Sequence, residues 1–211
     1  MRCTEAPVLT VGKDARDVEE RLVAGRLGCP RSGCGSRLGP WGHARPRVLR
    51  GAGGLRWRLR PRRARCVGCR RTHVLLPVGA LVRRADAAVV VGAALVAKAV
   101  GWGHRRIAER LGRPAATVRG WLRRFAARAG WLRAAFTALL CELDADPPVP
   151  EPQGSALGDA VAAIVAAMGA VTGRWSLLVG LSPWELAAAV TGGRLLSPGS
   201  RVEVGNTSCP W

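Results

Sequence analysis

The sequence predicts a mainly α-helical protein that carries a small β-strand module in its first half. Between residues 29 and 69, two short-spaced cysteine pairs flank a stretch in which apolar and basic residues alternate, a pattern typical of strands. From residue 85 onward, apolar residues recur at helical spacing in segments that glycine or proline closes. The chain of 211 residues is 48% hydrophobic, which is enough to bury a core and argues against general disorder.

Four cysteines have the spacing of a metal site. Four residues separate the first two, and two residues separate the last two. Structural Zn²⁺ sites are closed by four thiolates at such spacings. We therefore expect a structural Zn²⁺ in a β ribbon, bound by Cys29, Cys34, Cys66 and Cys69. Two disulfides or four unrelated thiols are the alternative, which the rest of the chain does not favour.

The remaining cysteines, Cys3, Cys141 and Cys209, have no partner by spacing. An odd cysteine count favours a reducing compartment. The acidic residues near the start of the chain are unlike a secretory or transit peptide. The longest apolar run, near residues 160–173, is too short to span a bilayer. We expect a soluble, cytoplasmic protein.

The net charge of +19 is concentrated in the middle of the chain. Residues 29–84 hold fifteen arginines and no acidic residue, and residues 85–136 hold ten basic and two acidic residues. Such a basic surface predicts a polyanionic partner, most often nucleic acid. An anionic membrane surface is the lesser alternative.

Residues 12–28 have the pattern of a short amphipathic helix. Asp14 can cap its start, Val18 and Leu22 lie four residues apart on one face, and Gly25 can end it. We expect this helix to pack against the β ribbon.

A strand pattern follows inside the ribbon, where apolar residues alternate with arginines. The alternation predicts a half-buried strand. We expect the side chains of Leu55, Trp57 and Leu59 to point inward. Those of Arg56, Arg58 and Arg60 should point outward. Because no acidic residue of the ribbon can neutralise these arginines, we expect them to contact phosphates; a solvated strand face is the alternative. For His73 and His43 we expect structural hydrogen bonds, since four cysteines already complete a zinc shell.

Residues 85–125 predict three helices. The first, over 85–100, is apolar and places Asp86 in its first turn. Two short helices follow, over 103–112 and 115–125, with Pro114 at the first position of the second. The second short helix has one apolar face and an opposite face that is small and basic. This arrangement predicts a helix-turn-helix whose second helix enters the major groove of DNA; an ordinary helical hairpin is the alternative.

The small, basic face supplies the candidate DNA contacts. Arg119 and Arg123 are suited to guanine edges, and Thr117 to a phosphate or a thymine methyl group. The predicted DNA-binding residues are Arg105, Arg106, Arg113, Ala116, Thr117, Arg119, Gly120, Arg123 and Arg124, together with Arg56, Arg58 and Arg60 of the ribbon.

Beyond the helix-turn-helix we expect a helix that continues over 126–143 and alanine-rich helices over 156–173 and 183–190, before an irregular end over 191–211. Their alanine faces suit close packing onto the upstream helices or a homodimer contact, and the sequence does not separate these. The expected divisions are an N-terminal amphipathic segment (1–28), the four-cysteine zinc ribbon (29–84), the helix-turn-helix domain (85–143), a proline-rich linker (144–155) and an alanine-rich helical tail (156–211).

The ribbon followed by the helix-turn-helix resembles the N-terminal part of certain insertion-sequence transposases. It also resembles a group of short actinobacterial proteins of uncharacterised function, over about residues 15–196. The resemblance rests on Cys29-Pro30, Cys34-Gly35, Trp41-Gly42, Arg65-Cys66, Cys69, the run Thr72–Pro77, the segments Gly103–Ala108 and Thr117–Leu122, and the later run Thr191–Leu196. The first cysteine pair departs from this family in its gap of four residues, where two are usual.

The resemblance implies DNA binding, and such transposases also need three acidic residues that hold two metal ions on a nuclease fold. The segment after Arg124 is helical and too short for such a nuclease fold, and three of its seven acidic residues crowd around the linker. We therefore expect a DNA-binding module without the nuclease domain and no enzymatic activity. Such a protein would be regulatory or associated with a mobile element. The alternative is an RNA-binding zinc-ribbon protein. Against it stands the lack of exposed aromatic residues for base stacking, since tyrosine is absent and Phe125 and Phe136 are expected in the core.

Overall fold

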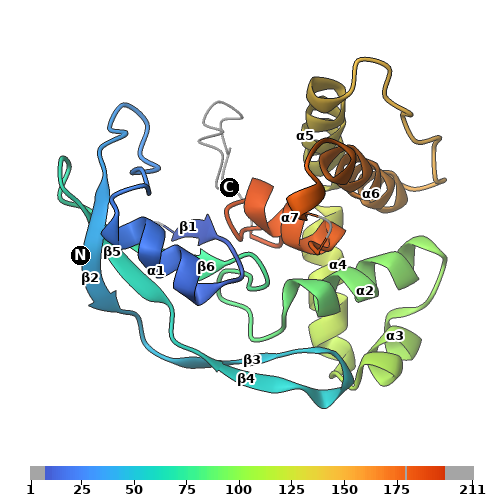
Figure 1. The fold of residues 1–211 in the computed structure, drawn as a ribbon. Coiled ribbons are helices and arrows are strands. Elements are labelled where there is room, and N and C mark those ends of the chain that lie inside the picture. Colours follow the sequence, from blue (N-terminus) through green and yellow to red (C-terminus); the bar gives the residue numbers. More distant parts are fainter. Residues whose placement is uncertain (1–7, 179, 198–211) are drawn as a thin grey trace.

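The computed structural model describes residues 8–178 and 180–197. A β-rich part lies on one side and a helical part on the other, and a long β hairpin runs beneath both (Figure 1). The described residues form seven α-helices and six strands. The predicted helical majority and the small β module are both present, but the strands reach further than expected, so the fold is mixed α/β.

The β-rich part is built on a four-stranded sheet. Its strand order is β1 (Val8–Val11), β6 (Thr72–Pro77), β5 (Arg62–Cys66) and β2 (Leu38–His43). Strand β1 runs parallel to β6, and the other neighbours are antiparallel. Strand β1 was not predicted, because its four residues do not alternate between apolar and polar and so carry too little signal.

Helix α1 (Ala15–Val23) covers this sheet as predicted. The side chain of Asp14 accepts a hydrogen bond from the backbone N–H of Arg16, and Val18 and Leu22 are buried. Gly25 adopts a left-handed φ of 68° just after the helix, as its role as a terminator requires. The helix and sheet share a small core, which is made of Val11, Val18, Leu22, Leu27, Cys29, Leu38, Ala64, Cys66 and Leu75.

Strands β3 (Arg47–Arg50) and β4 (Arg56–Leu59) form a separate two-stranded hairpin. A 3₁₀ turn over Ala52–Gly54 closes it. One side of the hairpin packs on the helical part, where Leu49 is buried and Leu59 is half-buried against the helices.

The prediction that the apolar side chains of this stretch are buried is wrong for two residues. Leu55 is 67% exposed and Trp57 is 43% exposed. Leu55 lies in the turn before β4 begins, and the ring of Trp57 lies over Gly51 near the tip. The buried residue on this face is instead Leu49, the cross-strand partner of Trp57.

The helix-turn-helix is present. Helix α2 (Ala88–Ala99) precedes α3 (His104–Leu111) and α4 (Ala115–Ala126). Gly112 ends α3 in the left-handed conformation, with φ 60° and ψ 45°. Pro114, expected at the first helical position, instead caps α4 from one residue earlier.

The expectation that helix continues over 126–143 is wrong in one detail. Helix α4 ends at Ala126, and a separate helix α5 (Ala129–Leu143) begins after a short break. At the break, Arg128 has a non-helical φ of −120°, and its guanidinium donates hydrogen bonds to the backbone carbonyls of Arg194 and Leu195. The break lets α5 pack along the later helix α6 (Ala156–Arg174).

Helices α6 (Ala156–Arg174) and α7 (Pro183–Val190) complete the helical part, with a 3₁₀ turn over Ser176–Leu178 between them. Both match the predicted helices, and α7 begins with a capping box between Ser182 and Glu185. Their small faces pack onto the upstream helices α2 and α5, which is the first of the two alternatives considered for them.

The helical core is continuous from the hairpin to the end of the described chain. It includes Leu49 of β3, the apolar faces of α2 to α7, and Leu195 and Leu196. The segment 191–197 lacks regular structure but is therefore part of the core, and the rest of the predicted irregular end, 198–211, lies outside the described residues. The expected helix-turn-helix domain and helical tail thus share one interior.

Helix α6 has enough length and apolar character to cross a membrane, so the expectation that this run is too short is not met. Half of its apolar window is buried inside the protein, however. Ala160, Ile164 and Ala167 are fully buried among neighbouring helices. Its hydrophobicity is that of a core helix.

The two parts of the fold also meet at α7. Lys13, which lies between β1 and α1, forms an ion pair of 3.1 Å with Glu185 and donates a 2.6 Å hydrogen bond to the carbonyl of Gly180. On the other side of α7, a Cβ added at Gly92 of α2 would lie 2.0 Å from Cγ of Trp184. Glycine at this position therefore permits the close approach of α2 and α7.

Candidate metal centre and nucleic-acid interface

The four predicted cysteine ligands converge at one end of the sheet. The ligand atoms of all four lie within 4.8 Å of one another. The Sγ atoms of Cys29 and Cys69 are 3.7 Å apart, and those of Cys34 and Cys66 are 3.6 Å apart. Cys29 and Cys66 are buried, whereas Cys34 and Cys69 are half-buried, so the cluster has one side open to an incoming ion. Four sulfur atoms at this spacing could hold a metal ion.

Backbone hydrogen bonds favour the thiolate form of two of these cysteines. The pKa of Cys34 is lowered to about 6, chiefly because the backbone N–H of Ser36 donates to its sulfur. The backbone of Arg71 likewise lowers the pKa of Cys69. Burial raises the pKa of Cys29 to about 12. Since four adjacent thiolates repel one another, the cluster suits a soft cation that would neutralise them.

His73 lies directly behind the cluster and is fully buried. Its Nε2 is 3.5 Å from the sulfur of Cys29, and in the tautomer with a proton on Nε2 it donates to that sulfur. Its pKa is lowered by burial and by the nearby charge of Arg71, which keeps the ring neutral. This is the structural hydrogen bond that we expected for His73. His43 is exposed at the end of β2.

The turn around the cluster depends on one close approach. A Cβ added at Gly68, between the last two cysteines, would lie 2.4 Å from the hydroxyl oxygen of Ser36. Only glycine therefore lets the second cysteine turn pack against the first.

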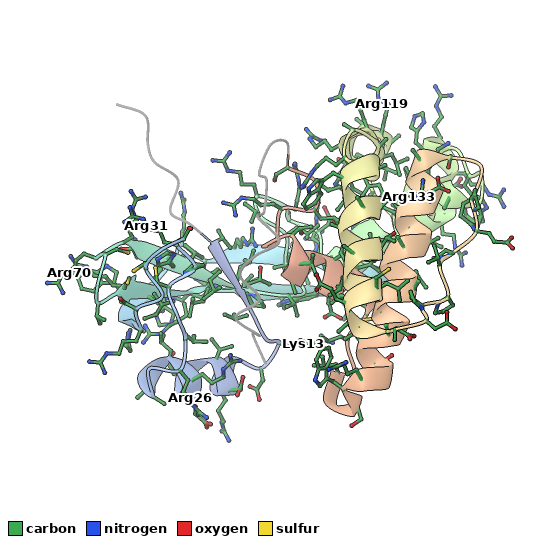
Figure 2. All side chains as sticks on the ribbon, turned by 90° about the horizontal axis from the view of Figure 1, so that it is seen from above. Lys13, Arg26, Arg31, Arg70, Arg119 and Arg133 are labelled. Atoms are coloured by element: carbon green, nitrogen blue, oxygen red, sulfur yellow. The ribbon has the colours of Figure 1, made fainter. Side chains whose placement is uncertain are left out.

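Helix α4 presents the predicted DNA-binding face to solvent. Its opposite face is buried, as predicted, at Val118, Trp121, Leu122 and Phe125. On the outer face Ala116, Arg119 and Arg123 are exposed, and Thr117, Gly120 and Arg124 are half-buried. Figure 2 shows Arg119 at the edge of the helical part, pointing away from the protein.

The half-buried positions on α4 have a specific packing. Nη1 of Arg124 donates a 3.1 Å hydrogen bond to the carbonyl of Gly120, one turn earlier. A Cβ at Gly120 would lie 2.8 Å from that same nitrogen. The arginine therefore lies back along the helix because residue 120 has no side chain.

Two further candidates stand at the start of α3. Arg105 and Arg106 are both exposed. The guanidinium of Arg106 lies over the ring of Trp102, 3.9 Å from its centroid, so its position is fixed by a cation–π contact.

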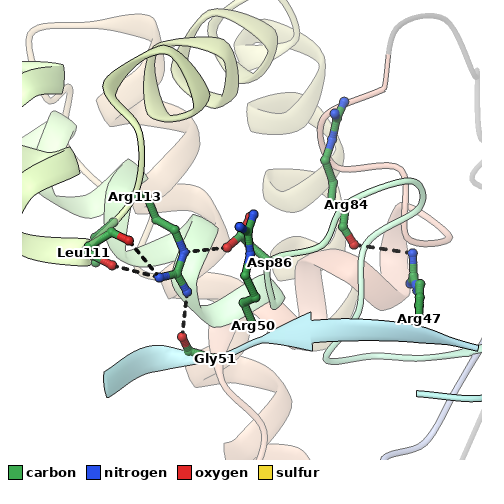
Figure 3. Close-up of polar contacts among 8 residues, drawn as sticks. Arg47, Arg50, Gly51, Arg84, Asp86, Leu111 and Arg113 are labelled. Atoms are coloured by element: carbon green, nitrogen blue, oxygen red, sulfur yellow. Dashed lines mark hydrogen bonds and ion pairs between the residues drawn. The ribbon is translucent and has the colours of Figure 1, made fainter. Parts of the chain in front are cut away.

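Arg113, also predicted to bind DNA, has a different role in the structure (Figure 3). Its Nε forms a 2.6 Å ion pair with Asp86, and Nη2 donates a 2.9 Å hydrogen bond to the carbonyl of Gly51 at the hairpin. Nη1 donates to the carbonyls of Leu111 and Gly112. These contacts use the whole guanidinium within the protein, so we remove Arg113 from the set of DNA contacts.

Asp86 differs from its prediction as well. Helix α2 starts two residues after it, so Asp86 is not in the first turn. It is buried, and it accepts a 2.7 Å contact from Arg50 of β3 in addition to that from Arg113. The sequence held one signal for this role, since Asp86 is the only acidic residue between Glu20 and Glu109. A lone carboxylate among so many arginines is placed to neutralise some of them.

The hairpin carries the remaining candidates. Arg56, Arg58 and Arg60 are exposed, as predicted. Between the hairpin tip and the helix-turn-helix lies an open cleft of about 480 Å³. It is lined on the hairpin side by Arg50 and the tip residues 53–56, and on the helical side by residues 109–113.

Sequence reasoning overlooked the tryptophans of the basic strands. Phe125 and Phe136 are buried as expected, but Trp41 and Trp57 are 49% and 43% exposed. The guanidinium of Arg65 lies 4.5 Å from the ring centroid of Trp41. The expected lack of exposed aromatic residues is therefore wrong. The exposure of Trp57 was not foreseen because the alternation around it predicted an inward side chain.

Residues 86–132 match the family model of a homeodomain-like domain. The match begins at the buried Asp86, covers α2, α3 and α4, and ends at the start of α5. No curated protein and no solved structure matches the chain. The chain thus contains a helix-turn-helix segment similar to homeodomain-like domains, which suggests DNA binding, beside a cluster of four cysteines that could hold a metal ion.

Proposed function

We propose that this protein binds duplex DNA through its helix-turn-helix and that the four cysteines hold a structural Zn²⁺. The observation that carries the proposal is the outer face of α4, which is small and basic, open to solvent, and part of the matched domain. In helix-turn-helix proteins the second helix enters the major groove with its N-terminal residues against base edges.

The contacts follow from the positions of the side chains. Arg119 and Arg123 are exposed one turn apart, which suits bidentate bonds to guanine edges. Ala116 leaves room for the groove wall, and Thr117 suits a phosphate or a thymine methyl group. Phosphate contacts from the helices are assigned to Arg105, Arg106 and Arg124, and Gly120 gives the guanidinium of Arg124 its position along α4.

Zinc is the metal that fits the donor set best. Four thiolates as the donor set favour Zn²⁺ over hard cations, and the closed shell that they would form supplies structure rather than catalysis. When bound, the ion would neutralise the thiolates. The buried His73 then orients Cys29 from behind, in the manner of outer-shell partners of metal ligands.

The biological setting is inferred from the resemblance to insertion-sequence transposases. We assign the protein to DNA binding without catalysis, as a regulator or an accessory of a mobile element acting in the cytoplasm. A homodimer contact through the C-terminal helices, the second alternative considered for them, would let two copies bind a repeated site.

The test is selection from random duplex DNA with the zinc-loaded protein at near-physiological salt. We expect an enriched motif, and we expect Arg119→Ala and Arg123→Ala each to lose about 1–3 kcal/mol of binding with relaxed preference at one base. Arg26→Ala is the matched control, because Arg26 is exposed on the opposite side of the molecule (Figure 2). Enrichment without any effect of the α4 variants would contradict the assigned interface.

RNA is the second candidate, and the exposed tryptophans favour it. Trp41 and Trp57 on arginine-rich strands resemble the aromatic platforms on which unpaired bases stack. Competition between labelled duplex DNA and unlabelled RNA would decide. Preferential displacement by single-stranded RNA, lost in Trp41→Ala, would replace the DNA assignment.

A further inference from the structure

We propose that the β3–β4 hairpin is a second DNA-binding arm, which contacts the minor groove of the duplex beside the site read by α4. This inference rests on the proposed binding of duplex DNA by the helix-turn-helix. It adds a second contact region, a groove and an apolar contact that the helix-turn-helix does not supply.

The first observation is the exposure of large apolar side chains on the hairpin. Leu55 and Val48 are 67% and 52% exposed, although Leu49 on the same hairpin is buried. Exposed apolar residues grouped on one element mark a binding surface. They are interleaved here with exposed Arg56 and Arg58, and no acidic residue occurs between positions 29 and 84. The complementary partner is therefore a polyanion that also offers apolar surface.

The second observation is the position of the tip. The tip residues 53–56 form one wall of the cleft whose other wall is the end of α3 and the following turn. The backbone carbonyl of Gly51 is bonded to Arg113, one residue before the cap of α4. The tip therefore lies beside the N-terminal end of α4, which is the end that approaches DNA in helix-turn-helix complexes.

The third observation is that the arm is held in place before any partner binds. The carboxylate of Asp86 joins Arg50 of the hairpin to Arg113 of the turn. At the tip, the backbone N–H of Gly51 donates a 2.8 Å hydrogen bond to the carbonyl of Leu55. The ring of Trp57 covers Gly51, where an added Cβ would lie 2.8 Å from the ring. A preorganised arm loses little entropy on binding.

The shape of the tip selects the minor groove. Ala52, Gly53 and Gly54 are small, so the larger Leu55 and Arg56 project next to a narrow turn. Minor-groove proteins combine these two residue types: a leucine or similar side chain contacts or enters between base steps, while arginines contact the groove and its phosphates. The major groove next to the arm is already assigned to α4. The structure thus assigns Leu55 to the minor groove and Arg56 and Arg58 to its phosphates.

Hydroxyl-radical footprinting tests the arm, because this probe reports protection of sugars along the minor groove. The duplex would carry the selected site with more than one helical turn of flanking sequence on each side. We expect the zinc-loaded protein to protect the site and one separate patch in the flank. Arg56→Gln/Arg58→Gln and Leu55→Ser should each lose the flank patch and keep the site.

Binding measured against salt gives a second readout. The double variant should lower the salt slope by about 2 on the long duplex, since each phosphate contact adds about one. It should leave the slope unchanged on a duplex trimmed to the selected site. Arg26→Gln/Arg31→Gln is the charge-matched control, because both arginines are exposed on the β-rich part, away from Arg119 at the edge of the helical part (Figure 2). We expect the control to keep the flank patch and the slope.

The outcomes separate this inference from the proposed function. Protection of the site without a flank patch, or a flank patch that persists in the double variant, would overturn the arm alone. Absence of protection on every duplex would overturn the proposed function. A change from dimer to monomer caused by Leu55→Ser in sedimentation would assign the apolar tip to a second copy of the chain and overturn the arm. Zinc content and thermal unfolding verify that each variant is folded.

Discussion

Asp86 and Arg113 form an ion pair of 2.6 Å in which the two side chains are only 3% and 9% exposed. The second carboxylate oxygen of Asp86 receives Arg50 at 2.7 Å. The three residues come from the segment before α2, the helix-turn-helix turn and strand β3. One buried carboxylate therefore fixes the orientation of the hairpin relative to the helix-turn-helix (Figure 3).

Replacing this carboxylate should be costly. We expect Asp86→Asn to destabilise the protein by about 3–5 kcal/mol, because it leaves two arginines close together and uncompensated. Urea unfolding would measure the loss. The matched control is Asp17→Asn, whose partner Arg21 lies 3.7 Å away and whose own side chain is 53% exposed. It should cost no more than about 1 kcal/mol, and equal losses for both variants would contradict the role assigned to Asp86.

Removing the metal should affect one core and spare the other. The cysteines belong to the small core under α1, whereas the hairpin residue Leu49 belongs to the helical core. We therefore expect Cys66→Ser, or chelation of zinc, to lower amide protection in residues 29–46 and 62–77. Residues 47–59 and 88–126 should keep theirs. Cys141→Ser, at an exposed position on α5, is the control, and loss of protection throughout the chain would refute the independence of the two cores.

The contact between α2 and α7 predicts an unusual cost for a small substitution. Gly92→Ala places a methyl group 2.0 Å from Cγ of Trp184, inside a closed helix interface. We expect a loss of about 1–3 kcal/mol or more from overpacking. Gly169→Ala in α6 is the control, because a Cβ there meets nothing within 4 Å, and it should stabilise by up to about 1 kcal/mol. Thermal unfolding of both variants would measure this, and a neutral Gly92→Ala would show that the helices separate freely.

A pH dependence is expected from Glu19 of α1. Both its oxygens accept hydrogen bonds from Arg62 of β5, at 2.7 and 2.9 Å, and this contact lowers the pKa of Glu19 below its ordinary value of 4.5. A carboxylate with a lowered folded-state pKa stabilises the protein above the unfolded pKa and loses that contribution as pH falls through the folded value. Glu19→Gln should therefore cost less than about 1 kcal/mol at pH 7, and nothing at a pH below the folded value.

Urea midpoints at neutral and acidic pH would measure that difference. Glu20→Gln, at the exposed neighbouring position, is the control and should leave the midpoint unchanged at both pH values. A cost for Glu19→Gln that persists at low pH would show that the side chain acts by packing rather than by charge.

The elements that the sequence predicted well are those encoded by neighbours in the chain. Local spacing and capping predicted helix α1 with its cap at Asp14, the apolar face of α4, and helix α7, which begins at Pro183. The cysteine cluster was also predictable, since metal ligation restricts cysteine spacing more than packing restricts apolar residues.

The features that sequence reasoning missed depend on distant partners. Strand β1 exists because β6 lies beside it, and Arg113 is buried because Asp86 and Gly51 approach it from elsewhere in the chain. Period-two alternation predicted a strand at residues 56–59 correctly. It could not show that Trp57 would stay 43% exposed while its cross-strand partner Leu49 is buried, because alternation reports which side chains share a face and not how deeply each is covered.

The packing of residues 191–196 has a consequence for the order of folding. Gly193 accepts a hydrogen bond from the N–H of Val82, and Arg128 donates to the carbonyls of Arg194 and Leu195, so both ends of the helix-turn-helix region contact a segment made much later. Contacts of such high sequence separation form slowly. During synthesis, α2 to α4 must wait for about seventy further residues to leave the ribosome before their core can close. The helix-turn-helix, and with it the proposed DNA binding, is therefore expected to form late, after the C-terminal helices have docked.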